Sequence, residues 1–142
     1  MSKKKMIAIL VIVAFLLTMI LPIIGMVKAD TIQLVVSLGA DLTKEQQDSM
    51  LDYMDVEREA IHIIETTIQE EAEYLRDTPA INHIGNRTIS SALVERLDEG
   101  QNISVDTHNI TWVSEDMYAN ALITAGVSDA RIIAAAPFEV SG

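Results

Sequence analysis

The sequence contains no cysteine, which excludes disulfides as a source of stability. The chain must therefore depend on a hydrophobic core, and 142 residues of which 49% are hydrophobic can supply one. Length and composition together predict one domain. If the chain is exported, the lack of cysteine is more typical of a bacterial envelope than of a eukaryotic secretory pathway.

Basic residues are scarce, since the sequence contains ten Lys and Arg but 21 Asp and Glu, which gives a net charge of −11. Four of these ten lie within the first 28 residues, whereas every acidic residue lies beyond residue 29. Without residues 1–29 the chain keeps six basic and 21 acidic residues, a net charge of −15. Such a surface repels phosphate backbones, so we expect no nucleic-acid partner.

The N-terminal residues have the order of parts found in secretion signals. Three lysines at residues 3–5 precede an apolar run at residues 6–21, and small residues stand third and first before Asp30. This predicts a signal peptide over residues 1–29, cleaved between Ala29 and Asp30. An uncleaved anchor is the alternative, because the apolar part approaches the length of a bilayer span. In both cases the remainder lies outside the cytoplasm, secreted or at the cell surface, and any membrane contact is through the N-terminal segment.

Hydrophobic periodicity and capping residues predict a mixed α/β domain over residues 30–142. Helices are expected to begin after the capping boxes at Thr43 and Thr67 and after Ser114. Strands are expected at residues 31–38, 60–66, 88–97, 103–111 and 130–138. The order is strand, helix, strand, helix, strand, strand, helix, strand. We expect one mixed sheet that combines strand-helix-strand units with a β-hairpin.

The hairpin is predicted where five residues, Asp98 to Asn102, join two strand-like runs. The apolar alternation of the second run changes near His108, which predicts a bulge there. The last strand is almost continuously apolar and is expected in the sheet interior. Because only four residues follow Phe138, we predict that the domain is truncated and that the chain is a fragment of a longer protein.

Ser90, Asp106 and His108 are the candidate residues for a serine hydrolase. Asp106 and His108 alternate onto one strand face, and Ser90 would lie nearby in the predicted hairpin. The sequence offers no Gly-x-Ser-x-Gly elbow and no glycine-rich helix start to supply an oxyanion hole. These three are therefore weak candidates, and no catalytic residue is predicted.

No metal or cofactor site is predicted. The three histidines are scattered singly, without the spacing that places two ligands on one helix face. The acidic residues Glu70, Glu71 and Glu73 are expected to form a solvated helix face, with an acidic cation-binding domain as the alternative. Trp112 is expected to be a core or edge anchor rather than a ligand platform.

Three segments resemble the YpuA-like family of exported proteins of unknown function from Gram-positive bacteria. They are LVVSLGADLTKEQQDSMLDYM, GNRTISSALVE and THNITWVSEDMYANALITAGVSDARIIAAAPFEVSG, of which the last is the most specific. The resemblance implies secretion or surface attachment, and it implies a helical C-terminal region beyond the residues matched. It carries over no catalytic residue, cofactor or partner.

These observations together predict a secreted or surface-associated bacterial protein that is a non-catalytic interaction module of the envelope. Its partner would be another protein or a cell-wall component. An extracytoplasmic hydrolase that uses Ser90, Asp106 and His108 is one alternative, and an acidic cation-binding domain is the other.

Overall fold

The structure, a computed structural model, describes residues 3–6, 10, 33–82 and 84–142. The predicted cleavage position between Ala29 and Asp30, and most of the predicted signal segment, lie outside these residues. Within the described part of the chain, no helix has both the length and the apolar character required to cross a bilayer.

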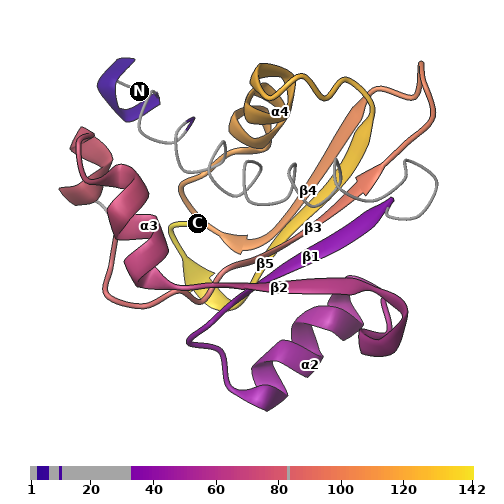
Figure 1. Cartoon of the computed structure of the whole chain (residues 1–142), viewed down its shortest axis with the longest axis horizontal. Coiled ribbons are helices and arrows are strands. Elements are labelled where there is room, and N and C mark those ends of the chain that lie inside the picture. The colour runs from indigo at the N-terminus through magenta and orange to yellow at the C-terminus, as the bar shows by residue number, and fades with distance from the viewer. Residues whose placement is uncertain (1–2, 7–9, 11–32, 83) are drawn as a thin grey trace.

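Five strands form one mixed sheet in the order β2-β1-β3-β5-β4 (Figure 1). Neighbouring strands pair in parallel at β1–β2 and β4–β5, whereas β3 is antiparallel to both of its neighbours. The elements are β1 (Leu34–Gly39), α2 (Lys44–Tyr53), β2 (His62–Thr66), α3 (Ile68–Leu75), β3 (Ser91–Arg96), β4 (Ile103–Ile110), α4 (Glu115–Thr124) and β5 (Ala130–Val140), with 3-10 turns at Arg58–Ala60 and Pro79–Asn82. The predicted mixed α/β class, single mixed sheet and element order are confirmed.

Capping interactions begin the helices where the sequence predicted them. The Gln46 amide donates to the Thr43 hydroxyl at 3.2 Å, and the Thr43 amide donates to the Gln46 side chain at 2.9 Å. Thr67 and Glu70 repeat this arrangement before α3. Each box satisfies two amides that the first helical turn leaves unpaired. After α4, Gly126 adopts φ +82, the left-handed conformation in which glycine is favoured.

The predicted β-hairpin is wrong, because β5 lies between β3 and β4. Leu93 pairs with Ile133 of β5, and Thr107 pairs with Ala134 on the other edge of that strand. A five-residue connection reaches up to about 17 Å, enough to cross the roughly 10 Å occupied by one inserted strand, so its length does not distinguish the two arrangements. The insertion gives the most apolar strand a neighbour on each edge and leaves the more polar β4 at the sheet edge.

The predicted irregularity near His108 is confirmed. The register between β4 and β5 shifts between His108 and Ile110, and Asn109 adopts φ +59. The Asn109 side-chain amide donates to the Ala136 carbonyl at 2.9 Å, which fixes the distorted segment to the neighbouring strand.

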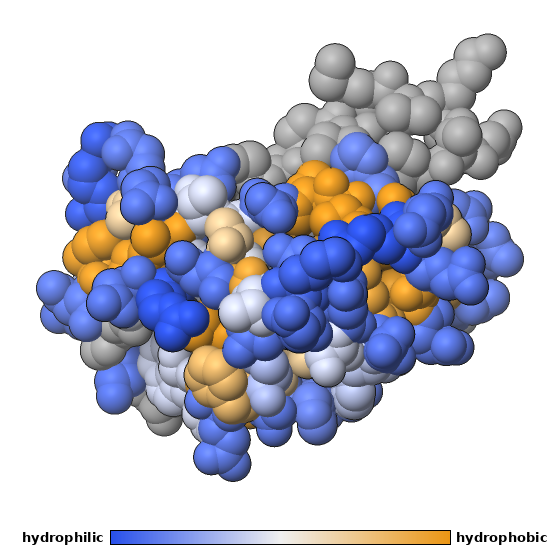
Figure 2. Space-filling model, turned by 90° about the horizontal axis from the view of Figure 1, so that it is seen from below, coloured by the Kyte–Doolittle hydropathy of each residue, from blue (hydrophilic) through white to orange (hydrophobic). Residues whose placement is uncertain are grey.

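Helices cover both faces of the sheet, with α2 on one side and α4 on the other (Figure 1). The α2 core contains Met50, Leu51 and Met54, and the α4 core contains Met117, Tyr118, Ala121 and Leu122. These four α4 residues are buried, whereas Ile123 on the same helix remains 60% exposed. Viewed from the α2 side, the surface is mostly hydrophilic with apolar side chains between the polar ones (Figure 2).

Candidate functional site

Asp106 and His108 lie on the α2 face of β4, where both contact Tyr53. The Tyr53 hydroxyl donates to the Asp106 carboxylate at 3.2 Å, and its ring stacks on His108 with centroids 4.4 Å apart. Partial burial and the neighbouring Asp106 carboxylate raise the pKa of Tyr53. This arrangement holds α2 against the edge strand.

Ser90 lies elsewhere, at the segment that leads into β3. It lines a cavity together with Tyr118 of α4, whereas Asp106 and His108 sit opposite Ile133 and Ala135 of the α2 core. The structure therefore does not bring the three hydrolase candidates together. It places Ser90 on one face of the sheet and the aspartate and histidine on the other.

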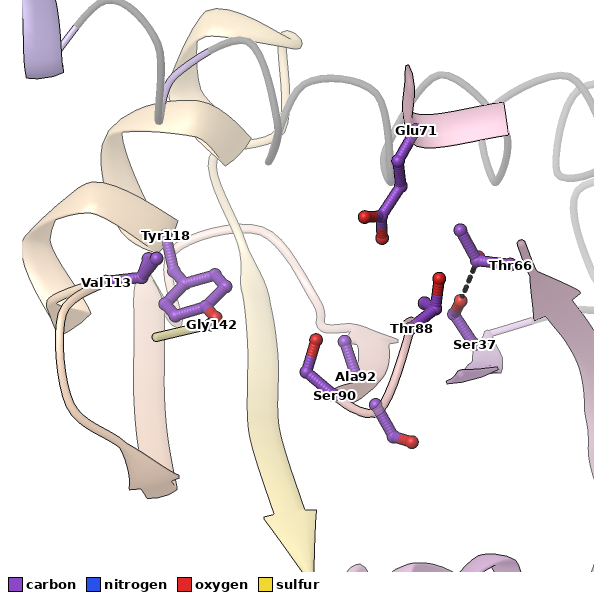
Figure 3. Close-up of a pocket in the computed structure, with 10 residues that line it drawn as sticks. Ser37, Thr66, Glu71, Thr88, Ser90, Ala92, Val113, Tyr118 and Gly142 are labelled. Atoms are coloured by element: carbon purple, nitrogen blue, oxygen red, sulfur yellow. Dashed lines mark hydrogen bonds between the residues drawn. The ribbon is translucent and has the colours of Figure 1, made fainter. Parts of the chain in front are cut away.

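The cavity beside Ser90 is small, about 20 Å³, and several hydroxyl groups line it (Figure 3). Ser37 of β1 and Thr66 of β2 are hydrogen-bonded to each other through their hydroxyls at 2.8 Å. The Thr88 hydroxyl belongs to a side chain only 3% exposed and has no hydrogen-bond partner among the described residues. A buried polar group without a partner is unfavourable, so Thr88 marks a place where a ligand or water would be bound favourably.

A second buried hydroxyl without a partner in the described chain, that of Ser91, faces the other way. Ser91 is opposite Ala135, a member of the α2 core, and opposed residues of an antiparallel pair point to the same face. Ser91 is among the residues that line the hydroxyl-lined cavity, but its side chain thus lies on the α2 face of the sheet.

Glu71 of α3 points its carboxyl group into the cavity toward Thr88 and Ser90 (Figure 3). Burial, together with the negative charges of Asp41 and Glu70, raises its pKa to about 7. No ion pair of the described residues involves Glu71. The prediction of a solvated acidic face is therefore wrong for Glu71, although Glu73 on the same helix is exposed.

The cavity continues into a cleft of about 260 Å³. Glu71, Thr88 and Ser90 line both spaces, and Asn86, Arg87, Trp112 and Val140 are among the residues that line the cleft alone. Trp112 is the one tryptophan of the sequence and is half-buried here. The structure places it both against the α4 core and in the wall of the cleft, so it is not only the anchor that the sequence predicted.

The topology explains why the cavity and the cleft form at this end of the sheet. Four strands, β1, β2, β4 and β5, run in one direction and finish here. The chain leaves β1 toward α2 on one face and leaves β4 toward α4 on the other. In open α/β sheets, crevices for ligands form outside the carboxyl ends of strands where the connections diverge.

Sequence reasoning placed Glu71 on a solvated helix face and did not identify Thr88, although the sequence carries a signal for the inward position of each. Glu71 is three residues after Ile68 and four before Leu75, so it belongs to the apolar stripe of α3 rather than to its solvated face. Thr88 lies four residues before Ala92, and side chains alternate between the two faces along an extended strand. The Thr88 side chain therefore points to the same buried face as that of Ala92.

Comparisons with known proteins agree with the family resemblance. A family described as "Protein of unknown function (DUF1002)" matches residues 38–142. The chain is 40% identical over 129 residues to "Uncharacterized protein YpuA" from Bacillus subtilis (strain 168), covering 91% of this chain and 44% of that protein. It thus spans less than half the length of this relative. No solved structure matches. The chain belongs to the DUF1002 family of proteins of unknown function.

Proposed function

We propose that this chain is a non-catalytic, extracytoplasmic binding module, and that the cleft beside Trp112 takes up a component of the bacterial cell wall. The observation that carries the proposal is the continuity of the hydroxyl-lined cavity with a cleft walled by the tryptophan. Small-molecule sites are concave and combine an aromatic or apolar wall with a few polar groups that orient the ligand.

The size of the cleft favours a small ligand group over a broad protein surface. Stable protein interfaces bury about 800 Å² on each partner, whereas this cleft of about 260 Å³ takes an object of the size of an amino acid or a sugar ring. The predicted export segment would deliver the domain to the wall. The net charge of −15 beyond residue 29 disfavours an anionic wall polymer and favours a neutral or cationic component.

The separation of Ser90 from His108 supports a binding role over hydrolysis. A serine nucleophile requires a base within hydrogen-bond reach, and the cavity around Ser90 offers Glu71 and hydroxyl groups but no imidazole from the described residues. Asp106 and His108 are engaged by Tyr53 instead.

Titration with soluble peptidoglycan fragments, followed by tryptophan emission, tests the proposal. Because Trp112 is the one tryptophan and lines the cleft, we expect a saturable change in emission. Asn86→Ala should weaken binding, since Asn86 lines the cleft, is exposed and carries a neutral amide that can donate and accept hydrogen bonds. His108→Ala, on the other face, is the matched control and should bind as the wild type does.

Two results would contradict the proposal. One is the absence of both an emission change and heat of binding with any wall fragment. The other is turnover of a fragment that His108→Ala abolishes while the fold is retained, which would indicate the hydrolase instead.

A further inference from the structure

We infer that the ligand of this cleft carries an ammonium group, which enters the cavity and is held by the Glu71 carboxylate and the Thr88 hydroxyl. The inference rests on the proposed function, because it names the chemistry of the group that the cleft would bind. It is drawn from three features of the cavity: its unpaired oxygen atoms, its size and its charge.

The cavity contains a carboxyl group and a hydroxyl group without partners in the part of the chain that the structure describes, and no cationic donor from that part lines it. Glu71 has no ion-pair partner, and the Thr88 hydroxyl has no hydrogen-bond partner, within the described residues. Their side chains point toward each other across the cavity, with Ser90 beside them (Figure 3). An ammonium group has three donors and no acceptor, so it can satisfy a carboxylate and two hydroxyl oxygens at once.

The size of the cavity favours an ammonium group over a metal ion. A space of about 20 Å³ holds a group of the size of one water molecule. Calcium requires six to eight oxygen ligands and usually several carboxylates, whereas Glu71 is the one carboxylate that lines this cavity. Among the described residues, no cluster of three or more His, Cys, Asp or Glu side chains has the arrangement of a metal site.

The charges around Glu71 also favour a cation. Asp41, in the turn after β1, and Glu70, on α3, both add negative charge. Tyr118 of α4 has its pKa raised by burial and is neutral. Arg87 is the cationic side chain that lines the cleft, and it extends to the Asp41 carbonyl at 3.5 Å rather than to Glu71. A bound ammonium group would supply the counter-charge that the Glu71 carboxylate lacks.

The cleft outside the cavity fits the rest of such a ligand. Ile84 and Val140 provide apolar contacts for methylene groups, and Trp112 provides an aromatic surface. An aromatic ring near the mouth also attracts a cation through its quadrupole. A short alkylammonium ion therefore contains the minimum features that we infer.

Calorimetry with n-butylammonium chloride tests the inference, and n-butanol is the matched neutral probe. At about pH 8 we expect saturable binding of the ammonium ion and none of the alcohol. Because the pKa of Glu71 is about 7, only about 1% of it is ionised at about pH 5, so the affinity should fall about 100-fold there. Equal affinity at both pH values would overturn the inference.

Variants distinguish the cavity from other sites on this acidic protein. Glu71→Gln should abolish butylammonium binding, whereas Glu73→Gln, an exposed position on the same helix, should leave it unchanged. Thr88→Val keeps the side-chain shape and removes an unpaired buried hydroxyl, so it should weaken binding without lowering stability. Loss of binding in Glu73→Gln, full binding in Glu71→Gln, or tighter binding of Ca²⁺ than of butylammonium to the same residues would overturn the inference.

A parallel titration separates this inference from the proposed function. If Glu71→Gln still binds wall fragments and the wild type does not bind butylammonium, the ammonium inference fails and the binding module remains. If the wild type binds neither probe, both fail.

Discussion

Replacement of Glu71 by glutamine should remove a pH dependence from the stability of the domain. The pKa of Glu71 is raised from 4.5 to about 7, because burial and two neighbouring carboxylates disfavour its charged form. This difference corresponds to about 3 kcal/mol between the protonated and ionised forms. The value is an upper bound, because the side chain keeps part of its contact with solvent.

The sign follows from proton binding. The folded protein holds the Glu71 proton more tightly than the unfolded chain does, so this residue makes the domain less stable as the pH rises from about 4.5 to about 7, with little change above that. Between about pH 5 and about pH 8, wild-type Glu71 should reduce the free energy of unfolding by about 2 kcal/mol. The Glu71→Gln variant should lack this contribution and be the more stable protein at about pH 8.

Urea denaturation of the wild type and of the variant at these two pH values measures the effect. The difference between the two proteins isolates Glu71 from the other groups that titrate in this range. Glu73→Gln is the control, since its exposed ion pair with Arg76 contributes little. Equal pH dependence of the wild type and Glu71→Gln would refute the account of a buried, unpaired carboxyl group.

Three further predictions concern residues that hold the strands and helices around the cavity in place. Gly39→Ala should lower the free energy of unfolding by about 2–3 kcal/mol, because an added Cβ would overlap the Thr88 carbonyl. Gly85→Ala is the control, since a Cβ added at Gly85 would meet open space. It should change the free energy of unfolding by less than about 0.5 kcal/mol in the same urea assay. Ser37→Ala and Thr66→Val should each cost about 1–2 kcal/mol, and the double variant should cost less than their sum, since the two hydroxyls bond each other; a fully additive cycle would contradict this. Ser114→Ala should lower the thermal midpoint through loss of about 1 kcal/mol of capping, and an unchanged midpoint would show that the cap is dispensable.

Local patterns in the sequence predicted the elements because their causes are local. The boxes at Thr43 and Thr67 involve residues three apart, and Gly126 ends α4 through its own backbone conformation. The pairing of β3 was mispredicted because the choice between β4 and β5 depends on burial of a strand that begins 20 residues after β4 ends. The length of the short connection between β3 and β4 does not show whether a strand from later in the sequence pairs between them.

The candidate site was harder to predict than the fold. Its members come from β1, β2, α3, the segment before β3 and α4, so their proximity arises only when the sheet is assembled. Periodicity shows that Glu71 and Thr88 point inward, yet it does not show that they meet. The hydrolase candidates illustrate the converse, since Asp106 and His108 do share a strand face but Ser90 lies across the sheet from them.

Mapping a wall-fragment titration by backbone amide chemical shifts tests the central claim most directly, because it locates the ligand without assuming its chemistry. A soluble disaccharide-peptide fragment should shift the amides of Arg87, Ser90 and Trp112, which line the cleft. Shifts confined to Tyr53, Asp106 and His108 on the opposite face, or no shifts at saturating fragment, would contradict the assignment of the cleft as the binding site.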